Sequence, residues 1–189
     1  MMFSTLDAIT KKLGIKFTEP ALGSFPAGTK YTPAPEVEEI AKQLIDKFRP
    51  ELSGWKIAYV FKATASKSKE GEILGQARRD NDLSRLLHGF DGMVIIAFDK
   101  WVSMDNDQKA RLTFHELEHF APNIEKSCLD IIEHPINEFP SVIKIFGPGQ
   151  ESDISFIEAY NDFCKNNSTA IDEIEEQRKK KAALDTDDE

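Results

Sequence analysis

The chain has 189 residues, 40% hydrophobic and 30% charged, which suits one domain whose core can fold without disulfide bonds or a structural metal. Its 24 basic and 33 acidic side chains give a net charge of −9, which argues against a protein built mainly to bind nucleic acid. We see neither an apolar run of the roughly 18 residues that a membrane span needs nor a secretory signal, so we expect a cytoplasmic protein without a membrane segment.

Three segments of different composition follow one another along the chain. Residues 1–34 are rich in proline and glycine, which predicts a loose N-terminal arm with a short helix near residues 6–13. Residues 35–150 hold the apolar patterns of a folded domain. Residues 151–189 are helical in composition and become strongly acidic, which predicts a helical tail that ends in a disordered stretch.

The folded segment opens with a helix and then strands. Apolar residues at helical spacing after Pro35 predict an amphipathic helix that ends before Pro50. Residues 55–61 are β-branched and aromatic, which is typical of a strand. Residues 63–70 are small and basic and predict a flexible turn, and residues 72–79 predict a second strand at the edge of the sheet.

Further along, one strand and two helices are predicted. Residues 81–88 form a polar connection with leucines at helical spacing, and residues 93–98 are a nearly continuous apolar run, typical of a strand buried on both faces. A helix is predicted over residues 107–120, with Ser103 or Asp105 as its N-cap. A second helical segment is predicted over residues 133–146.

Residues 115–119 read His-Glu-Leu-Glu-His inside a predicted helix. Side chains four residues apart share one helix face, so His115 and His119 can bind one metal ion. Glu116 follows the first ligand directly and can act as general base toward a metal-activated water. Zinc suits this chemistry, because it takes nitrogen and oxygen ligands and has no redox activity. Pro122 and Glu125 stand where the metzincin pattern needs Gly and His, which disfavours that class.

A catalytic zinc site usually has three protein ligands and one open position. His134 is our first candidate for the third ligand, because it opens the next predicted helical segment. Glu138 lies one turn later and is the alternative, and Asp130 and Glu133 are also close in sequence. Whichever of His134 and Glu138 does not bind zinc can orient a ligand through a hydrogen bond.

Several sequence blocks occur in the order seen in the phage metallopeptidase family, which residues 31–149 resemble. These blocks are a Lys-rich turn at 62–69, Gly75, Asp99 and Trp101 after the apolar strand, His115–Phe120, a His-x-x-x-Glu-Phe block from His134 to Phe139, and Gly147. There is also a looser similarity to SprT-like proteases, which place a third histidine at a comparable distance.

The resemblance implies a zincin-like α+β fold, with a small mixed sheet packed against the His-Glu-x-x-His helix. It also implies zinc held by His115, His119 and His134, with Glu116 as the catalytic base. One position departs from the family pattern: Pro135 follows His134, where an acidic residue is common.

These observations lead to one main hypothesis and two alternatives. The main hypothesis is a cytoplasmic zinc metallopeptidase, in the host cytoplasm if it is phage-encoded, whose protein or peptide substrate adds to the strand at residues 72–79. The first alternative is a non-catalytic zinc-binding module of phage or prophage origin that binds another protein. The second is nucleic-acid association through the basic residues at 62–69 and 78–79, which the negative net charge weakens.

Overall fold

The computed structural model describes residues 8–18, 23–68, 71–133 and 138–149, together with residues 154–155, 157–159 and 161–162. The chain divides into two compact units, Met1–Gly147 and Pro148–Glu189. In the second unit, residues 154–155, 157–159 and 161–162 are helical, and Pro148 and Gly149 are not. Among the described helices, none has the length and apolar content that crossing a membrane requires.

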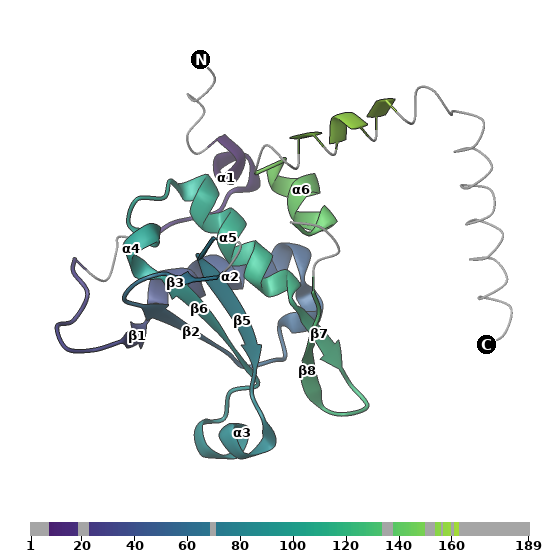
Figure 1. The fold of residues 1–189 in the computed structure, drawn as a ribbon. Helices are drawn as coiled ribbons and strands as arrows, with labels where there is room; N and C mark the ends of the chain where they lie inside the picture. The colour runs from purple at the N-terminus through teal and green to yellow at the C-terminus, as the bar shows by residue number, and fades with distance from the viewer. Residues whose placement is uncertain are drawn as a thin grey trace, which may run out of the picture. The chain divides into compact units, whose positions relative to one another are not determined.

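Helices and strands are interspersed along the first unit (Figure 1). The helices are α1 (Ala8–Leu13), α2 (Pro35–Phe48), the 3-10 helix η1 (Pro50–Leu52), α3 (Asp82–His88), α4 (Phe98–Trp101), α5 (Asn106–Glu118) and α6 (Pro140–Phe146). The strands are β1 (Tyr31–Pro33), β2 (Ile57–Lys62), β3 (Ser66–Lys67), β4 (Glu72–Ile73), β5 (Gly75–Arg79), β6 (Gly92–Ala97), β7 (Phe120–Asn123) and β8 (Cys128–Ile131).

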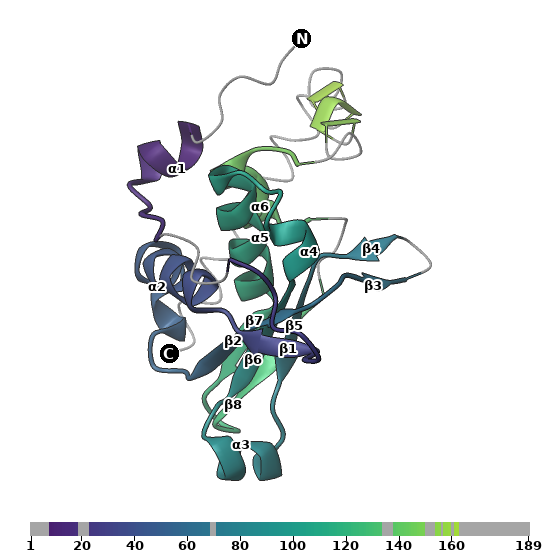
Figure 2. The same cartoon turned by 90° about the vertical axis from the view of Figure 1, so that its left-hand side faces the viewer.

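The main sheet has four strands in the order β1-β2-β6-β5. Strands β2 and β6 are parallel, whereas β1 and β5 pair antiparallel with their neighbours. β5 is therefore an edge strand, as predicted. The short pairs β3–β4 and β7–β8 are separate hairpins, and Figure 2 shows the first extending away from the main sheet. The prediction of an α+β fold with a small mixed sheet is confirmed.

The core lies between this sheet and the helices α2 and α5, which pack side by side (Figure 2). Phe61 of β2 lies opposite Ile96 of β6, and both are fully buried. Alternate side chains of a strand point to opposite faces, so these two mark the face toward the helices. Helices α2 and α5 contribute fully buried residues to the same core, among them Val37, Ala41, Leu44, Ala110 and Leu117.

Helix α5 begins at a well-formed N-terminal cap. Asp105, one of the two predicted caps, accepts a hydrogen bond from the Gln108 N–H at 2.8 Å, and the Gln108 side chain accepts one from the Asp105 N–H at 3.0 Å. This reciprocal capping box satisfies two backbone donors that a helix start would otherwise leave unpaired. The sequence thus fixes where α5 starts, and hence the turn on which its histidines lie.

Part of the predicted N-terminal arm is attached to the domain. The backbone N–H groups of Ile9 and Thr10 in α1 donate to the Asp107 carboxylate, at 3.0 and 2.7 Å, in the first turn of α5. Ile15, just after α1, is buried in the core. α1 and Ile15 therefore attach this part of the arm to the domain, because the Asp107 carboxylate accepts hydrogen bonds from N–H groups in the first turn of α1.

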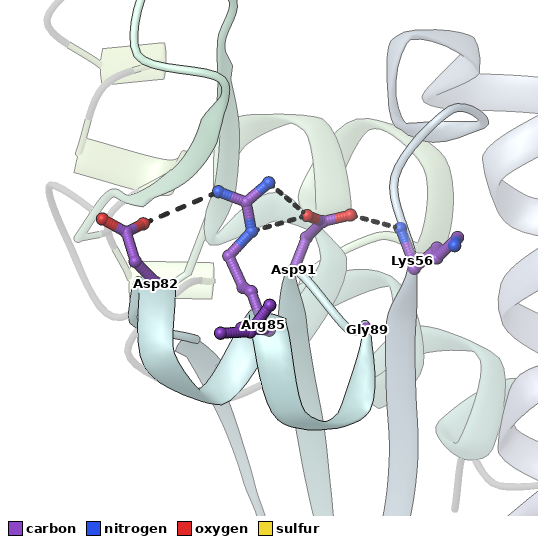
Figure 3. A pocket seen from close by; sticks show the side chains of 6 residues that line it. Lys56, Asp82, Arg85, Gly89 and Asp91 are labelled. Carbon is purple, nitrogen blue, oxygen red and sulfur yellow. Dashed lines mark hydrogen bonds and ion pairs between the residues drawn. The ribbon is translucent and has the colours of Figure 1, made fainter.

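The predicted strand over residues 72–79 is divided in two. It breaks at Leu74 into β4 and β5. β4 pairs with β3, and β3 lies within residues 63–70, which were predicted to form only a turn. The polar connection that follows forms α3, which buries none of its residues. A charge cluster attaches this helix to the sheet: Asp91 accepts hydrogen bonds from the Arg85 side chain and from the Lys56 N–H, both at 2.9 Å (Figure 3).

The prediction of one helix over residues 133–146 is wrong at the described residues before Pro140. The described residues Glu138 and Phe139 are not helical, and α6 begins at Pro140. A proline disfavours the helical conformation of the residue before it, so Phe139 cannot continue a helix into Pro140. The hairpin β7–β8 was also not predicted: β7 starts directly after His119, where the sequence indicated only the end of a helix.

Candidate metal centre

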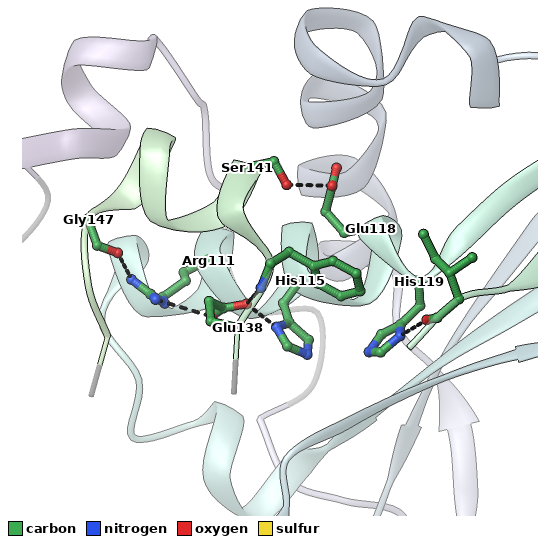
Figure 4. Close-up of polar contacts among 9 residues, drawn as sticks. Arg111, His115, Glu118, His119, Glu138, Ser141 and Gly147 are labelled. Atoms are coloured by element: carbon green, nitrogen blue, oxygen red, sulfur yellow. Dashed lines mark hydrogen bonds and ion pairs between the residues drawn. The ribbon is translucent and has the colours of Figure 1, made fainter. Parts of the chain in front are cut away.

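His115 and His119 lie one turn apart at the C-terminal end of α5, as predicted. Their ring centroids are 5.1 Å apart and the rings meet edge to face. Figure 4 shows both rings on the same side of α5, with the His119 ring directed toward His115. The two rings therefore lie next to each other rather than pointing in opposite directions.

The Nδ1 atom of each ring is engaged by a different part of the chain. Nδ1 of His119 lies 2.7 Å from the backbone carbonyl of Ile132, which can only accept, so this nitrogen carries a proton. Nδ1 of His115 is hydrogen-bonded to the Glu138 carboxylate. When Nδ1 is held in this way, Nε2 is the nitrogen that binds a metal. In both rings Nδ1 is thus the protonated nitrogen.

Glu138 links His115 to the guanidinium of Arg111. Its other carboxylate oxygen accepts from Arg111 at 3.1 Å, and the Phe139 N–H donates to the first oxygen at 3.0 Å. Although burial acts in the opposite direction, the hydrogen bond from His115 and the charge of Arg111 lower the pKa of Glu138. Arg111 also donates to the Gly147 carbonyl at the end of α6 (Figure 4). Glu138 is thereby a charged, fully bonded partner for the Nδ1 edge of His115.

The ring of Phe139 packs against both imidazole rings. Its ring centroid lies 5.4 Å from that of His115 and 4.8 Å from that of His119, in edge-to-face arrangements. Phe139 is 5% exposed, so its ring shields this side of the two imidazoles from water. Packing of this kind restricts ring rotation and lowers the local dielectric, which strengthens electrostatic interactions at the site.

Glu116 is buried, with 3% of its surface exposed. The Ala77 N–H in β5 hydrogen-bonds to its carboxylate, while Oε2 has no hydrogen-bond partner among the described residues. Burial raises the pKa of Glu116 to about 7, against the opposing effects of the His115 charge and the Ala77 bond. A buried carboxylate oxygen without a partner is costly, and such groups in native proteins commonly have a functional role.

Gly75 makes room for this carboxylate. It pairs with Ile96, which places its Cα in the row of the sheet that faces α5. A Cβ atom there would lie 2.7 Å from Cδ and 2.9 Å from Cγ of Glu116, and closer still to Oε1. Distances under about 3.0 Å are not tolerated without displacement. The absence of a side chain at residue 75 is therefore what allows Glu116 to pack against the edge strand.

The third predicted ligand, His134, lies outside the residues that the structure describes. Within the described residues, no three His, Cys, Asp or Glu side chains are grouped so as to hold a metal ion. Of the other nearby candidates, Asp130 is bonded to Asn123 at 2.8 Å and to Arg79 at 3.1 Å, and Glu133 is exposed. Two imidazoles with fixed Nδ1 atoms and a neighbouring buried carboxylate nevertheless fit the donor preferences of zinc.

Three residues of the site were not predicted as functional from the sequence. Arg111 lies four residues before His115, so helical spacing alone places it on the same face of α5. Phe139 adjoins a candidate ligand, but its contact with both rings depends on the turn before α6. Gly75 was noted only as part of a family pattern, since a glycine in a strand does not reveal what lies across from it.

Residues 29–166 match the family model described as "Putative phage metallopeptidase". The match covers more than half of the chain and includes α5 with its two histidines. Searches of curated proteins and of solved structures found no match to the chain. The looser similarity to SprT-like proteases stays a prediction.

Proposed function

The chain belongs to the phage metallopeptidase family, and from this premise we propose that it is a zinc-dependent peptidase with a zincin-like fold. Zinc would be held by Nε2 of His115 and His119 and by His134, with Glu138 orienting His115. The observation that carries the proposal is the pair of facing imidazoles, each with Nδ1 engaged, next to a buried carboxylate. We place its action in the cytoplasm, that of the host if the protein is phage-encoded.

A zinc ion bound at this position would polarise the scissile carbonyl and lower the pKa of a bound water to about 7. Glu116 would take a proton from the attacking water through its carboxylate, which lies beside His115 in the sequence and in the site. It then delivers this proton to the nitrogen of the leaving amine. Ala77 holds the carboxylate in place through its N–H, and Phe139 limits the access of bulk water.

The substrate is proposed to be a protein or peptide in extended conformation. β5 is the edge strand that contacts Glu116, and one of its sides is paired with β6. An extended peptide can add to such an edge through backbone hydrogen bonds, which depend little on its sequence. This arrangement would lay a peptide bond beside the general base.

Removal and return of the metal test the proposal. The purified protein is expected to contain about one zinc ion per chain, as a three-ligand catalytic site would hold. It should cleave an unfolded protein such as casein, lose this activity on dialysis against a chelator, and regain it when zinc is added. Cleavage that survives complete removal of metal would contradict the proposal. Zinc binding without any cleavage would instead favour a non-catalytic interaction module.

Glu138→Gln should weaken zinc binding about 10- to 100-fold, the usual effect of losing a hydrogen-bonded partner of a histidine ligand. The substitution keeps the shape of the side chain but removes the charge that holds the Nδ1 proton of His115. The measurement is a competition titration with a zinc-sensitive dye. Asp130→Asn is the matched control, since Asp130 bonds Asn123 and Arg79 instead. Equal zinc affinity of wild type and Glu138→Gln would exclude this role.

A further inference from the structure

We propose that Arg49 is a positioning residue for His119 and that Glu118 and Ser141 extend its effect to the rest of the site. The inference rests on the proposed zinc site, because its consequence is the geometry of a ligand. It concerns residues far apart in the sequence, on the end of α2, the end of α5 and the start of α6.

Arg49 follows α2 and reaches across to the C-terminal end of α5. Its guanidinium donates to the carbonyl of Leu117 at 3.1 Å and to the carbonyl of Phe120 at 2.6 Å. It also bonds the Glu118 carboxylate at 3.0 Å and the Glu51 carboxylate. The side chain is 14% exposed, so these bonds are largely shielded from water. The bonded backbone groups lie on both sides of His119 in the sequence.

These contacts meet a specific need of the helix end. The last carbonyls of an α-helix have no partner within the helix and carry partial negative charge, so a cation there is stabilising. β7 begins at Phe120, directly after His119, so the chain changes direction at the ligand itself. The Ile132 N–H also donates to the His119 carbonyl at 2.9 Å. The backbone on both sides of the His119 ring is therefore held by Arg49 and by Ile132, directly after β8.

Glu118 connects Arg49 to the start of α6. One of its oxygens is bonded to Arg49, and the other accepts from the Ser141 hydroxyl in the first turn of α6 (Figure 4). The residues just before Ser141 include Glu138, which bonds His115, and Phe139, which covers both rings. Ser141 thus fixes the segment that supports the histidines from the opposite side. The Glu118 side chain is 13% exposed, and both of its carboxylate oxygens are bonded to protein groups.

The planar guanidinium of Arg49 is suited to bonding several acceptors at the end of α5 at once. It presents several donors in a rigid fork and here bonds two carbonyls and two carboxylates. The single ammonium of lysine keeps the charge but cannot reach all of these acceptors in fixed directions. A purely electrostatic role of Arg49 would therefore survive Arg49→Lys, whereas a positioning role would not.

Cobalt(II) substitution provides the test, because the visible absorption of the bound ion reports ligand geometry independently of peptide cleavage. Arg49→Lys should bind Co2+ about 10- to 100-fold more weakly than wild type, with a shifted absorption spectrum, as for other partners that orient a ligand. The control is Arg85→Lys, which removes a similar fork from Asp91 in the α3 region. It should leave both the affinity and the spectrum unchanged.

Wild-type affinity and spectrum in Arg49→Lys would overturn the inference. If Arg49→Lys does not fold, Ser141→Ala is used instead, because it removes the hydrogen bond from Ser141 to Glu118. A Co2+ spectrum of Ser141→Ala identical to that of wild type would then overturn the inference. A wild-type chain that binds neither Co2+ nor Zn2+ would overturn the proposed metal site itself, and the inference with it.

Discussion

Glu116→Gln is expected to abolish measurable peptide cleavage while zinc remains bound. General acid–base catalysis by one side chain contributes about 10²- to 10⁴-fold, so kcat/KM should fall by that factor. The amide keeps the size of the side chain and its bond from the Ala77 N–H, but it cannot take a proton from the attacking water. Cleavage rate and zinc content, measured on the same preparation, check this expectation.

Two controls show whether this loss reflects chemistry. The first is Glu125→Gln, the same substitution at an exposed position between β7 and β8, which should leave cleavage unchanged. The second is the melting temperature without metal, which should not be lower in Glu116→Gln than in wild type. A neutral amide is cheaper to bury than a carboxylate that lacks one hydrogen bond. Cleavage by Glu116→Gln at the wild-type rate would refute the assigned role.

Gly75→Ala should be the second most damaging change near the site, although it adds a single methyl group. That methyl would lie 2.7 Å from Cδ of Glu116 and must push the carboxylate away from the edge strand. Displacing a catalytic group by about 1 Å can cost about 100-fold in rate, so kcat/KM should fall by roughly this factor. Zinc should stay bound, because neither histidine contacts residue 75 in the described interactions.

The control for this variant is Gly54→Ala, where a Cβ atom would meet nothing within 4 Å and cleavage should be unchanged. A double variant tests the mechanism. Because Gly75→Ala acts through Glu116, it should cause little further loss in a Glu116→Gln background. Independent, multiplicative losses would show that the methyl group damages the enzyme by another route.

The sequence was sufficient to predict the parts of the site that lie on one helix. His115, Glu116 and His119 are within five consecutive residues, and their relation follows from the helical repeat alone. Asp105 was likewise predictable as a cap, since capping uses residues three apart in the chain. The central strand β6 was predicted from its apolar run because a strand buried on both faces needs no alternation.

The segment that contains Glu138 and Phe139 was predicted less well, although Pro140, which explains its conformation, is visible in the sequence. Helical periodicity suggested a continuous helix over residues 133–146, which would have put Glu138 one turn after His134. Pro140 disfavours the helical conformation at Phe139, which is extended, and α6 begins only at Pro140. Glu138 therefore meets the Nδ1 edge of His115, a position that we propose for orienting a ligand.

The amino-acid sequence by itself determined how the proposed ligands His115 and His119 and the proposed general base Glu116 lie relative to one another, because the local geometry of α5 places them. Only the tertiary structure decided which ring nitrogen of each histidine is held, what buries Glu116, and which distant side chains support the helix end. Those features depend on Arg49, Gly75 and Glu138, each of which is distant from its partner along the chain. Contacts of this kind arise from packing between elements, and the spacing of residues along one element does not encode them.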